Sequence, residues 1–285
     1  MNLFSLYKKS LKNTMVEDPV DLSFFRPIGF MFANLLMRTP VTPNGITAIS
    51  MLSGIITGIF YTGGQASTTL VAGLLLLTTN ILDCTDGQLA RMKGAASKLG
   101  RILDGLADYI TGISVFTGIV IGYTGKFYTL PTWWGLVILA AFSIILQSSL
   151  VDTYRSRFIA WTKGRSQSLQ EELKEFEEDD KHKSNHVFER FIVKIYCLYL
   201  RWNIKISPRR SRSMAKPDYN RLIMKNKRVI RGWSMIGPST RITVAVIASL
   251  VNRPDYYFIA IVIPFNLFAL TLYILQSILD SKEKG

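Results

Sequence analysis

The chain has 285 residues, 48% of them hydrophobic, and a mean hydropathy of +0.22. Its long apolar stretches exclude an ordinary soluble globule and predict an all-α integral membrane protein. The net charge of +14 predicts an anionic partner. Because the basic residues flank apolar stretches, we expect lipid headgroups or nucleotides and no nucleic acid.

Residues 1–43 are predicted to form a cytoplasmic arm. The first 20 residues are basic but contain no apolar stretch long enough for a cleavable signal peptide, so we expect insertion through internal spans. Pro27 suits a helix start. Aromatic and apolar residues from there to Met37 predict a short amphipathic helix that lies in the membrane interface.

Six apolar stretches follow, and each is long enough to cross a hydrocarbon core of about 30 Å. We expect the six transmembrane helices at residues 44–62, 67–92, 96–123, 130–156, 234–252 and 255–279. Asn44 is expected to cap the first of them, with an approach to a ligand as the alternative.

A polar insertion at residues 157–232 separates the fourth and fifth spans. Apolar residues recur at helical spacing from Phe188 to Tyr199 and predict an amphipathic helix that rests on the membrane or on the bundle. The chain therefore divides into 1–43, 44–156, 157–232 and 233–285.

Lysine and arginine predict the orientation. They are concentrated at the N-terminus, between residues 93 and 101, after Arg155 and in the C-terminal tail, whereas the alternate connections hold little beyond Lys126 and Arg253. Because cytoplasmic loops carry the excess of positive charge, we expect both termini on the cytoplasmic side of a bacterial inner (cell) membrane.

Four aspartates stand at helical spacing within two of the predicted spans. Asp83 and Asp86 lie near the end of the second span, and Asp104 and Asp108 lie in the first half of the third. A turn near Gly94 joins the two antiparallel helices, so their acidic faces can oppose each other. Protonation or divalent cations would relieve the repulsion. Oxygen ligands select Mg²⁺ or Mn²⁺, and four carboxylates suit a two-ion site for phosphoryl transfer.

Small residues accompany these aspartates. Gly87 and Ala90 leave space on the acidic face of the second span, and Gly100 does the same on the third, so a phosphorylated ligand can approach the backbone. Arg91 offers a planar cation to a phosphate oxygen. The alternative, ion pairs and small-residue packing between helices, explains single positions but not eight in a fixed pattern.

The string LDCTDGQLARMKGAASKLGRILDGLADY resembles the signature of the CDP-alcohol phosphatidyltransferase family, with every fixed position present. The resemblance covers residues 40–160 and 230–280 and implies six spans and a homodimer. It implies that an alcohol displaces CMP from a CDP-linked donor. The implied metal ligands, for two ions, are Asp83, Asp86, Asp104 and Asp108.

The resemblance also implies roles for single residues. Asp108 would act as the general base on the acceptor hydroxyl. Gly87 and Ala90 would lie near the cytidine nucleotide, and Arg91 would contact its phosphates. Gly100 is expected on the opposite side of the same donor site.

The signature does not decide between two branches of the family. One moves a phosphatidyl group from CDP-diacylglycerol to a small polar alcohol, and the other moves phosphocholine or phosphoethanolamine to a lipid hydroxyl. Four arginines flank the fourth and fifth spans and could converge on an anionic acceptor such as inositol phosphate or glycerol phosphate: Arg155, Arg157, Arg231 and Arg241. This favours the first branch. Membrane anchoring explains Arg155 and Arg157 equally well, but Arg241 lies inside an apolar run.

A cation-coupled transporter is the alternative from another class, because carboxylates inside a membrane often mark a cation path. The acids gather at one edge of the predicted spans, and Arg91 lies among them. Both features favour an enzyme. A structural scaffold would give no reason for Gly87 and Ala90 on the acidic face.

Overall fold

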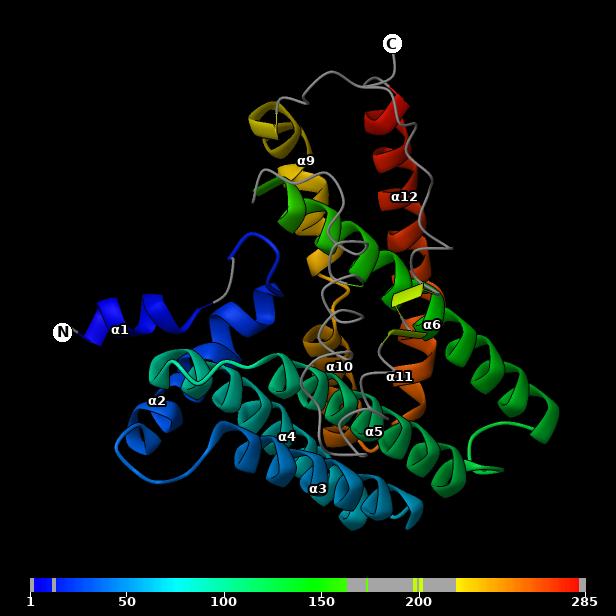
Figure 1. Cartoon of the computed structure of the whole chain (residues 1–285). Helices are drawn as coiled ribbons and strands as arrows, with labels where there is room; N and C mark the ends of the chain where they lie inside the picture. Colours follow the sequence, from blue (N-terminus) through cyan, green and yellow to red (C-terminus); the bar gives the residue numbers. More distant parts are fainter. Residues whose placement is uncertain are drawn as a thin grey trace.

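The computed structural model describes residues 3–11, 14–162, 173, 197–198, 200–201 and 219–281, and within them the chain is helical and contains no strand (Figure 1). The helices are α1 Leu3–Ser10, α2 Arg26–Leu36, α3 Pro43–Thr62, α4 Ala66–Lys93, α5 Lys98–Tyr123, α6 Leu130–Thr162, α9 Tyr219–Ser234, α10 Pro238–Leu250, α11 Asp255–Ala260 and α12 Asn266–Ser281. Two π-helical turns connect helices without a break: η1 Asp21–Phe25 continues into α2, and η2 Ile261–Phe265 joins α11 to α12.

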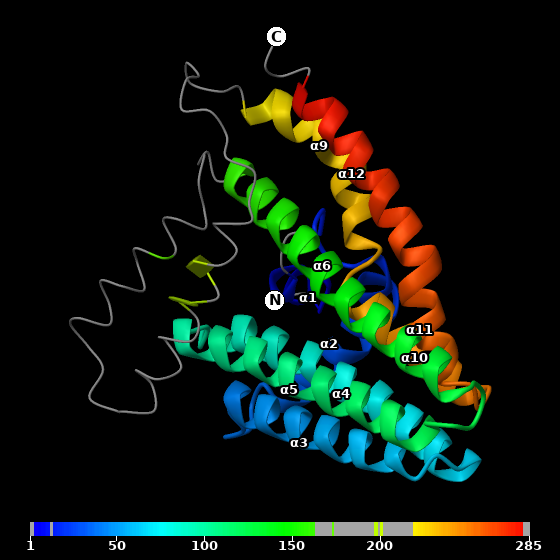
Figure 2. The ribbon, with the colours of Figure 1, turned by 90° about the vertical axis from the view of Figure 1, so that its right-hand side faces the viewer.

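The helices form two groups. α3, α4 and α5 pack side by side, α10 packs on α4, and α6, α9 and α12 make up the second group (Figures 1 and 2). α3 and α5 approach to backbone contact: a Cβ on Gly118 would lie 2.2 Å from the carbonyl oxygen of Gly58. Such contacts between small residues are a usual way for helices to associate in a membrane.

Five helices are long and apolar enough to cross a membrane: Pro43–Thr62, Ala66–Lys93, Gly100–Tyr123, Leu130–Thr162 and Asp255–Ser281. They agree with five of the predicted spans to within a few residues at most ends. The largest difference is in α6, which continues to Thr162 although the span was predicted to end at residue 156.

The span predicted at residues 234–252 is not one long helix. α9 ends at Ser234, and α10 begins only at Pro238. A proline disfavours helical backbone in the residue before it, and Gly237 has a ψ of 173°. The 13 residues of α10 reach about 20 Å, which is less than the ~30 Å of a hydrocarbon core. A sixth full span is therefore not confirmed within the described residues.

The N-terminal arm packs against the helices. α2 lies where the interfacial helix was predicted, and its buried residues Phe30 and Ala33 contact a cluster that includes Leu89 and Met92 of α4. Of the polar insertion, the structure describes mainly the end of α6 and the start of α9. The helix predicted from residue 188 to residue 199 lies outside the described residues, apart from 197 and 198.

The expected cap of α3 was wrong. Thr42 is the N-cap, and its hydroxyl accepts a hydrogen bond of 3.2 Å from the amide of Gly45. Pro43 takes the first helical position, where its missing N–H costs nothing, so the residue before it becomes the cap. Asn44 is thereby already inside the helix.

Candidate active site

The turn between α4 and α5 has the conformation that the sequence predicts. Gly94 ends α4 with a φ of +66°, and the amide of Ala95 donates a hydrogen bond of 2.9 Å to the carbonyl of Ala90. Ser97 then caps α5 by accepting from the amide of Gly100 at 2.9 Å. The two antiparallel helices therefore face each other with their acidic sides.

Three of the predicted aspartates come together. The carboxylates of Asp83 and Asp86, from α4, and of Asp104, from α5, each offer an oxygen, and these oxygens lie within 4.8 Å of one another. Asp86 is only 3% exposed. Like charges this close repel unless a proton or a cation lies between them, and a set of oxygen donors fits a hard divalent ion such as Mg²⁺ or Mn²⁺.

A threonine from a third helix supports the cluster. The hydroxyl of Thr47, on α3, donates a short hydrogen bond to Oδ2 of Asp86, and Thr47 itself is buried. A partner of this kind fixes the orientation of a ligating carboxylate. The sequence analysis missed Thr47, because nothing in its local pattern links it to a residue 39 positions later.

Asp108 lies one helical turn after Asp104 on α5 and is exposed. The group of three does not include it. Its spacing of four residues places it on the same face of the helix as Asp104. Its roles as a ligand of a second ion and as a general base remain predictions.

Two of the predicted donor-site glycines differ in their surroundings. Among the described residues, the nearest neighbour of a Cβ on Gly87 would be the guanidinium of Arg91 at 3.5 Å, which is an ordinary contact. A Cβ on Gly100 would lie 3.0 Å from Oγ of Ser97 and 3.1 Å from Oδ1 of Asn44. Packing therefore accounts for Gly100, whereas packing within the chain does not require a glycine at position 87. Ala90, on the same helix, is partly buried.

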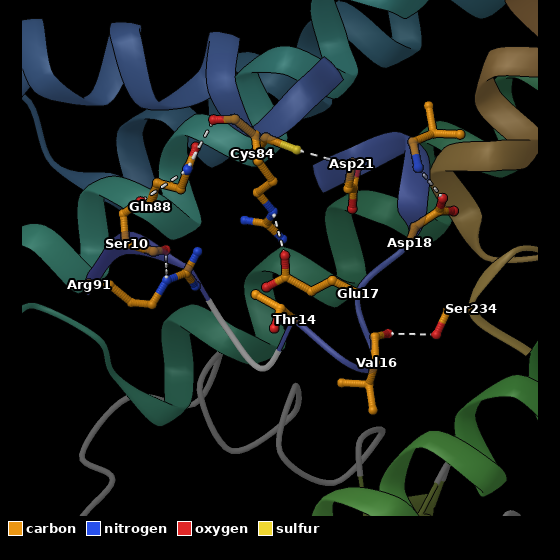
Figure 3. Close-up of polar contacts among 12 residues, drawn as sticks. Ser10, Thr14, Val16, Glu17, Asp18, Asp21, Cys84, Gln88, Arg91 and Ser234 are labelled. Atoms are coloured by element: carbon orange, nitrogen blue, oxygen red, sulfur yellow. Dashed lines mark hydrogen bonds and ion pairs between the residues drawn. The ribbon is translucent and has the colours of Figure 1, made fainter. Parts of the chain in front are cut away.

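Arg91 lies between the acidic cluster and the N-terminal arm. It interacts electrostatically with Asp86 and Asp104. Its Nε donates a short hydrogen bond to the carbonyl of Ser10, as Figure 3 shows. Its Nη2 is buried and has no hydrogen-bond partner among the residues that the structure describes. A phosphate oxygen would satisfy that donor.

Two of the four predicted acceptor arginines are neighbours. Arg155 of α6 and Arg241 of α10 interact electrostatically with each other, and both interact with Asp18 and Asp152. Arg241 is 7% exposed, and its buried Nε has no hydrogen-bond partner in the described part of the chain. A buried guanidinium with an unsatisfied donor is costly, and an anionic ligand would supply the missing acceptor.

The other two arginines are held differently. Arg231 donates a hydrogen bond of 2.9 Å from Nη1 to the carbonyl of Thr14 in the N-terminal arm. Arg157 donates two hydrogen bonds of 2.8 Å to Asp280 and stacks on the ring of Trp161. Arg157 thus has a carboxylate partner within the chain, and its case as an acceptor ligand is the weakest of the four.

Buried acids in the N-terminal arm are the second feature that the sequence analysis missed. Glu17, Asp18 and Asp21 are all buried, and Glu17 lies 3.5 Å from Arg26 (Figure 3). Burial raises the pKa of Asp21 above its usual value, although the charge of Arg26 opposes this. No spacing rule in the sequence connects these residues to partners such as Cys84 and Thr240, which follow 63 and 222 positions later.

Comparison with known proteins gives relatives that share part of this chain. A phosphatidylinositol phosphate synthase of Corynebacterium glutamicum is 29% identical over 138 residues, which are 48% of this chain and 56% of the relative. The bifunctional IPC transferase and DIPP synthase of Thermococcus kodakarensis is 33% identical over 127 residues, 43% of this chain and 27% of the relative. The archaetidylinositol phosphate synthase of Pyrococcus horikoshii is 36% identical over 83 residues, 29% of this chain and 42% of the relative. The chain therefore spans roughly a quarter to just over half of the length of these relatives.

Residues 40–170 match the family model of the CDP-alcohol phosphatidyltransferases. The matched stretch contains α3, α4, α5 and the clustered carboxylates of Asp83, Asp86 and Asp104. Together with the five membrane-length helices, this makes the chain an integral membrane protein. Residues 40–170 are therefore similar in sequence to the CDP-alcohol phosphatidyltransferases.

Proposed function

We propose that this chain is a metal-dependent phosphotransferase of phospholipid synthesis. It moves a phosphatidyl or similar lipid phosphate group from a CDP-linked lipid to a small polar alcohol and releases CMP. The observation that carries the proposal is the meeting of three carboxylates, within 4.8 Å of one another, in the stretch that is similar to this family.

The chemistry of the acids supports a metal role. Asp83, Asp86 and Asp104 would hold Mg²⁺ or Mn²⁺, with Asp108 completing a site for two ions. Bound there, the ions would neutralise the charge that develops on the diphosphate as its phosphorus–oxygen bond breaks. Thr47 orients Asp86, and Arg91 offers its buried Nη2 to a phosphate oxygen.

Asp108 is the proposed general base. It takes the proton from the acceptor hydroxyl, whose oxygen attacks the phosphorus that carries the lipid. The new phosphorus–oxygen bond forms as the bond to CMP breaks, and CMP leaves with the electron pair. An exposed carboxylate beside the cluster is reachable by a polar acceptor from the aqueous side.

A phosphorylated inositol is the acceptor that we would test first. Relatives are named phosphatidylinositol phosphate synthase and archaetidylinositol phosphate synthase. The buried, incompletely satisfied Arg241 beside Arg155 fits an acceptor with a phosphate of its own. Serine is a second candidate, because one relative is named a CDP-diacylglycerol–serine O-phosphatidyltransferase.

The proposal includes an orientation and an assembly. Both termini and the acidic cluster would lie on the cytoplasmic side of a bacterial inner membrane, α2 would lie in the interface, and the chain would form a homodimer. The distribution of basic residues supports the orientation, and the family resemblance supports the homodimer.

The test is CMP release by the purified protein in detergent with CDP-diacylglycerol and Mg²⁺. Inositol phosphate, inositol, glycerol phosphate and serine are compared as acceptors, and the first should give the highest rate. Asp108→Asn should abolish release, because the amide cannot take the proton. Release that is unaffected by this change would remove Asp108 from the mechanism.

Two alternatives make different predictions in the same assay. An enzyme of the choline and ethanolamine branch would release CMP from CDP-choline or CDP-ethanolamine with diacylglycerol as acceptor. A cation-coupled transporter would release no CMP from any donor but would carry cations into proteoliposomes.

A further inference from the structure

Three of the candidate acceptor arginines come from three different helices. Arg155 lies on α6, Arg231 on α9 and Arg241 on α10. Guanidinium groups on separate helices bind one ligand only if those helices are held at fixed positions relative to one another.

One short segment of the N-terminal arm contacts all three helices. We call residues 14–18 the clasp. The carbonyl of Thr14 accepts from Arg231 at 2.9 Å. The carbonyl of Val16 accepts from Nε of Arg155 at 2.6 Å. The same carbonyl accepts from Oγ of Ser234 at 3.0 Å (Figure 3). The clasp thus binds two of the arginines directly.

Asp18 connects the clasp to the third helix. Its carboxylate is 1% exposed and accepts two hydrogen bonds from Thr240: 2.9 Å from the amide and 2.8 Å from the hydroxyl. Thr240 lies in the first turn of α10 and immediately precedes Arg241. Asp18 therefore satisfies an amide that has no partner within the helix and fixes the turn that carries the arginine.

Gly237 shows how closely Asp18 approaches. A Cβ at this position would lie 2.9 Å from Oδ2 of Asp18 and 3.0 Å from the carbonyl oxygen of Ser234. The φ of Gly237 is −69°, which any residue can adopt, so its own backbone conformation does not require glycine. Within the described residues, the absent side chain makes room for the carboxylate.

We propose that Asp18 is a positioning residue for the anionic acceptor: through Thr240 it places Arg241 beside Arg155, and it thereby sets the affinity for a phosphorylated alcohol. The inference rests on the proposed function and extends it to a residue outside the family-matched domain, residues 40–170. In this proposal Asp18 acts on the acceptor only through Thr240 and Arg241.

Two variants displace the contact in different ways. Asp18→Ala removes the carboxylate. Gly237→Ala keeps the Asp18 side chain, but the added methyl group displaces its carboxylate away from α10. A displacement of about 1 Å can cost a hundredfold, so we expect each variant to raise the KM for inositol phosphate by roughly 10- to 100-fold. The KM for CDP-diacylglycerol and the Mg²⁺ dependence should stay at the wild-type values.

A double-mutant comparison separates positioning from general damage. If Asp18 acts through Arg241, then Asp18→Ala should raise the acceptor KM no further in an Arg241→Ala background. The matched control is Asp255→Ala, which removes another fully buried aspartate, near the other end of α10. It should leave the acceptor KM unchanged even if it lowers thermal stability.

The outcomes are distinguishable. An acceptor KM that stays unchanged in Gly237→Ala and Asp18→Ala overturns the inference, as do additive effects of Asp18→Ala and Arg241→Ala. Equal increases in the donor and acceptor KM also overturn it, because they indicate general damage. A wild-type protein that releases no CMP with any acceptor overturns the proposed function, and this inference with it.

Discussion

The two ends of the helix bundle differ in how their charged and polar side chains are arranged. At the end where α5 meets α6 and α10 meets α11, several polar groups of the described residues form complementary pairs. Tyr61 and Ser249 share a hydrogen bond of 2.6 Å. Asp255 accepts from Tyr128 and from Arg253, each at 2.8 Å. These pairs join distant segments and need no ligand to balance them.

The opposite end also holds an ion pair, Arg157 with Asp280, but groups of like charge gather there as well. Asp83, Asp86 and Asp104 bring three carboxylates together, and Arg155 lies beside Arg241. Such arrangements cost free energy in the absence of a counter-charge. The gathered carboxylates and the two neighbouring guanidinium groups therefore indicate where a cation and an anionic substrate bind.

The largest effect is expected from the acidic cluster. Asp104→Asn removes the contribution of α5 to the group of three. Loss of an outer partner of a metal ligand typically costs 10- to 100-fold, so loss of a ligand itself should lower CMP release by at least about 100-fold. The measurement is CMP release at saturating substrate, with a thermal unfolding scan to show that the protein is folded. Full activity in this variant would contradict the metal role.

The next effect concerns the support of that cluster. Thr47→Val removes the hydroxyl that donates to Asp86 and keeps the volume of the side chain. We expect the Mg²⁺ concentration for half-maximal activity to rise by about 10-fold. Thr57→Val is the matched control, because in the described residues the hydroxyl of Thr57 donates to a carbonyl of its own helix, that of Ser53 at 2.9 Å. Equal shifts in both variants would show that Thr47 has no special role.

The arginines give a third comparison. Arg241→Ala should raise the acceptor KM much more than the donor KM, by about 10-fold, because a hydrogen bond to a charged group is lost. Arg157→Ala should change the acceptor KM less, since Arg157 is paired with Asp280. A larger effect at Arg157 would place the acceptor on the other side of α6.

The smallest effect on activity is expected at the end where α10 meets α11. Asp255→Asn weakens the contacts with Tyr128 and Arg253 and should lower the midpoint of thermal unfolding by several degrees. CMP release per folded molecule should stay close to wild type. If the variant lost activity while its thermal unfolding midpoint stayed at the wild-type value, the functional distinction between the two ends of the bundle would be wrong.

Much of the local structure could be predicted. The lengths of the apolar stretches predicted five membrane-length helices that the structure confirms. Gly94 and Ser97 define the turn that makes α4 and α5 antiparallel. The break between α9 and α10 was missed, although Gly237 and Pro238 signal it, because the apolar run continues through them. Hydropathy measures composition, and backbone constraints decide whether a run is one helix.

The sequence by itself determined the acidic helix faces, because carboxylates spaced three or four residues apart must share a face and a short turn must bring two such faces together. Only the tertiary structure decided which distant residues complete the site: Thr47 against Asp86, and the clasp against α6, α9 and α10. Contacts of this kind depend on how whole helices pack, and helix packing is set by complementary surfaces that no local spacing records.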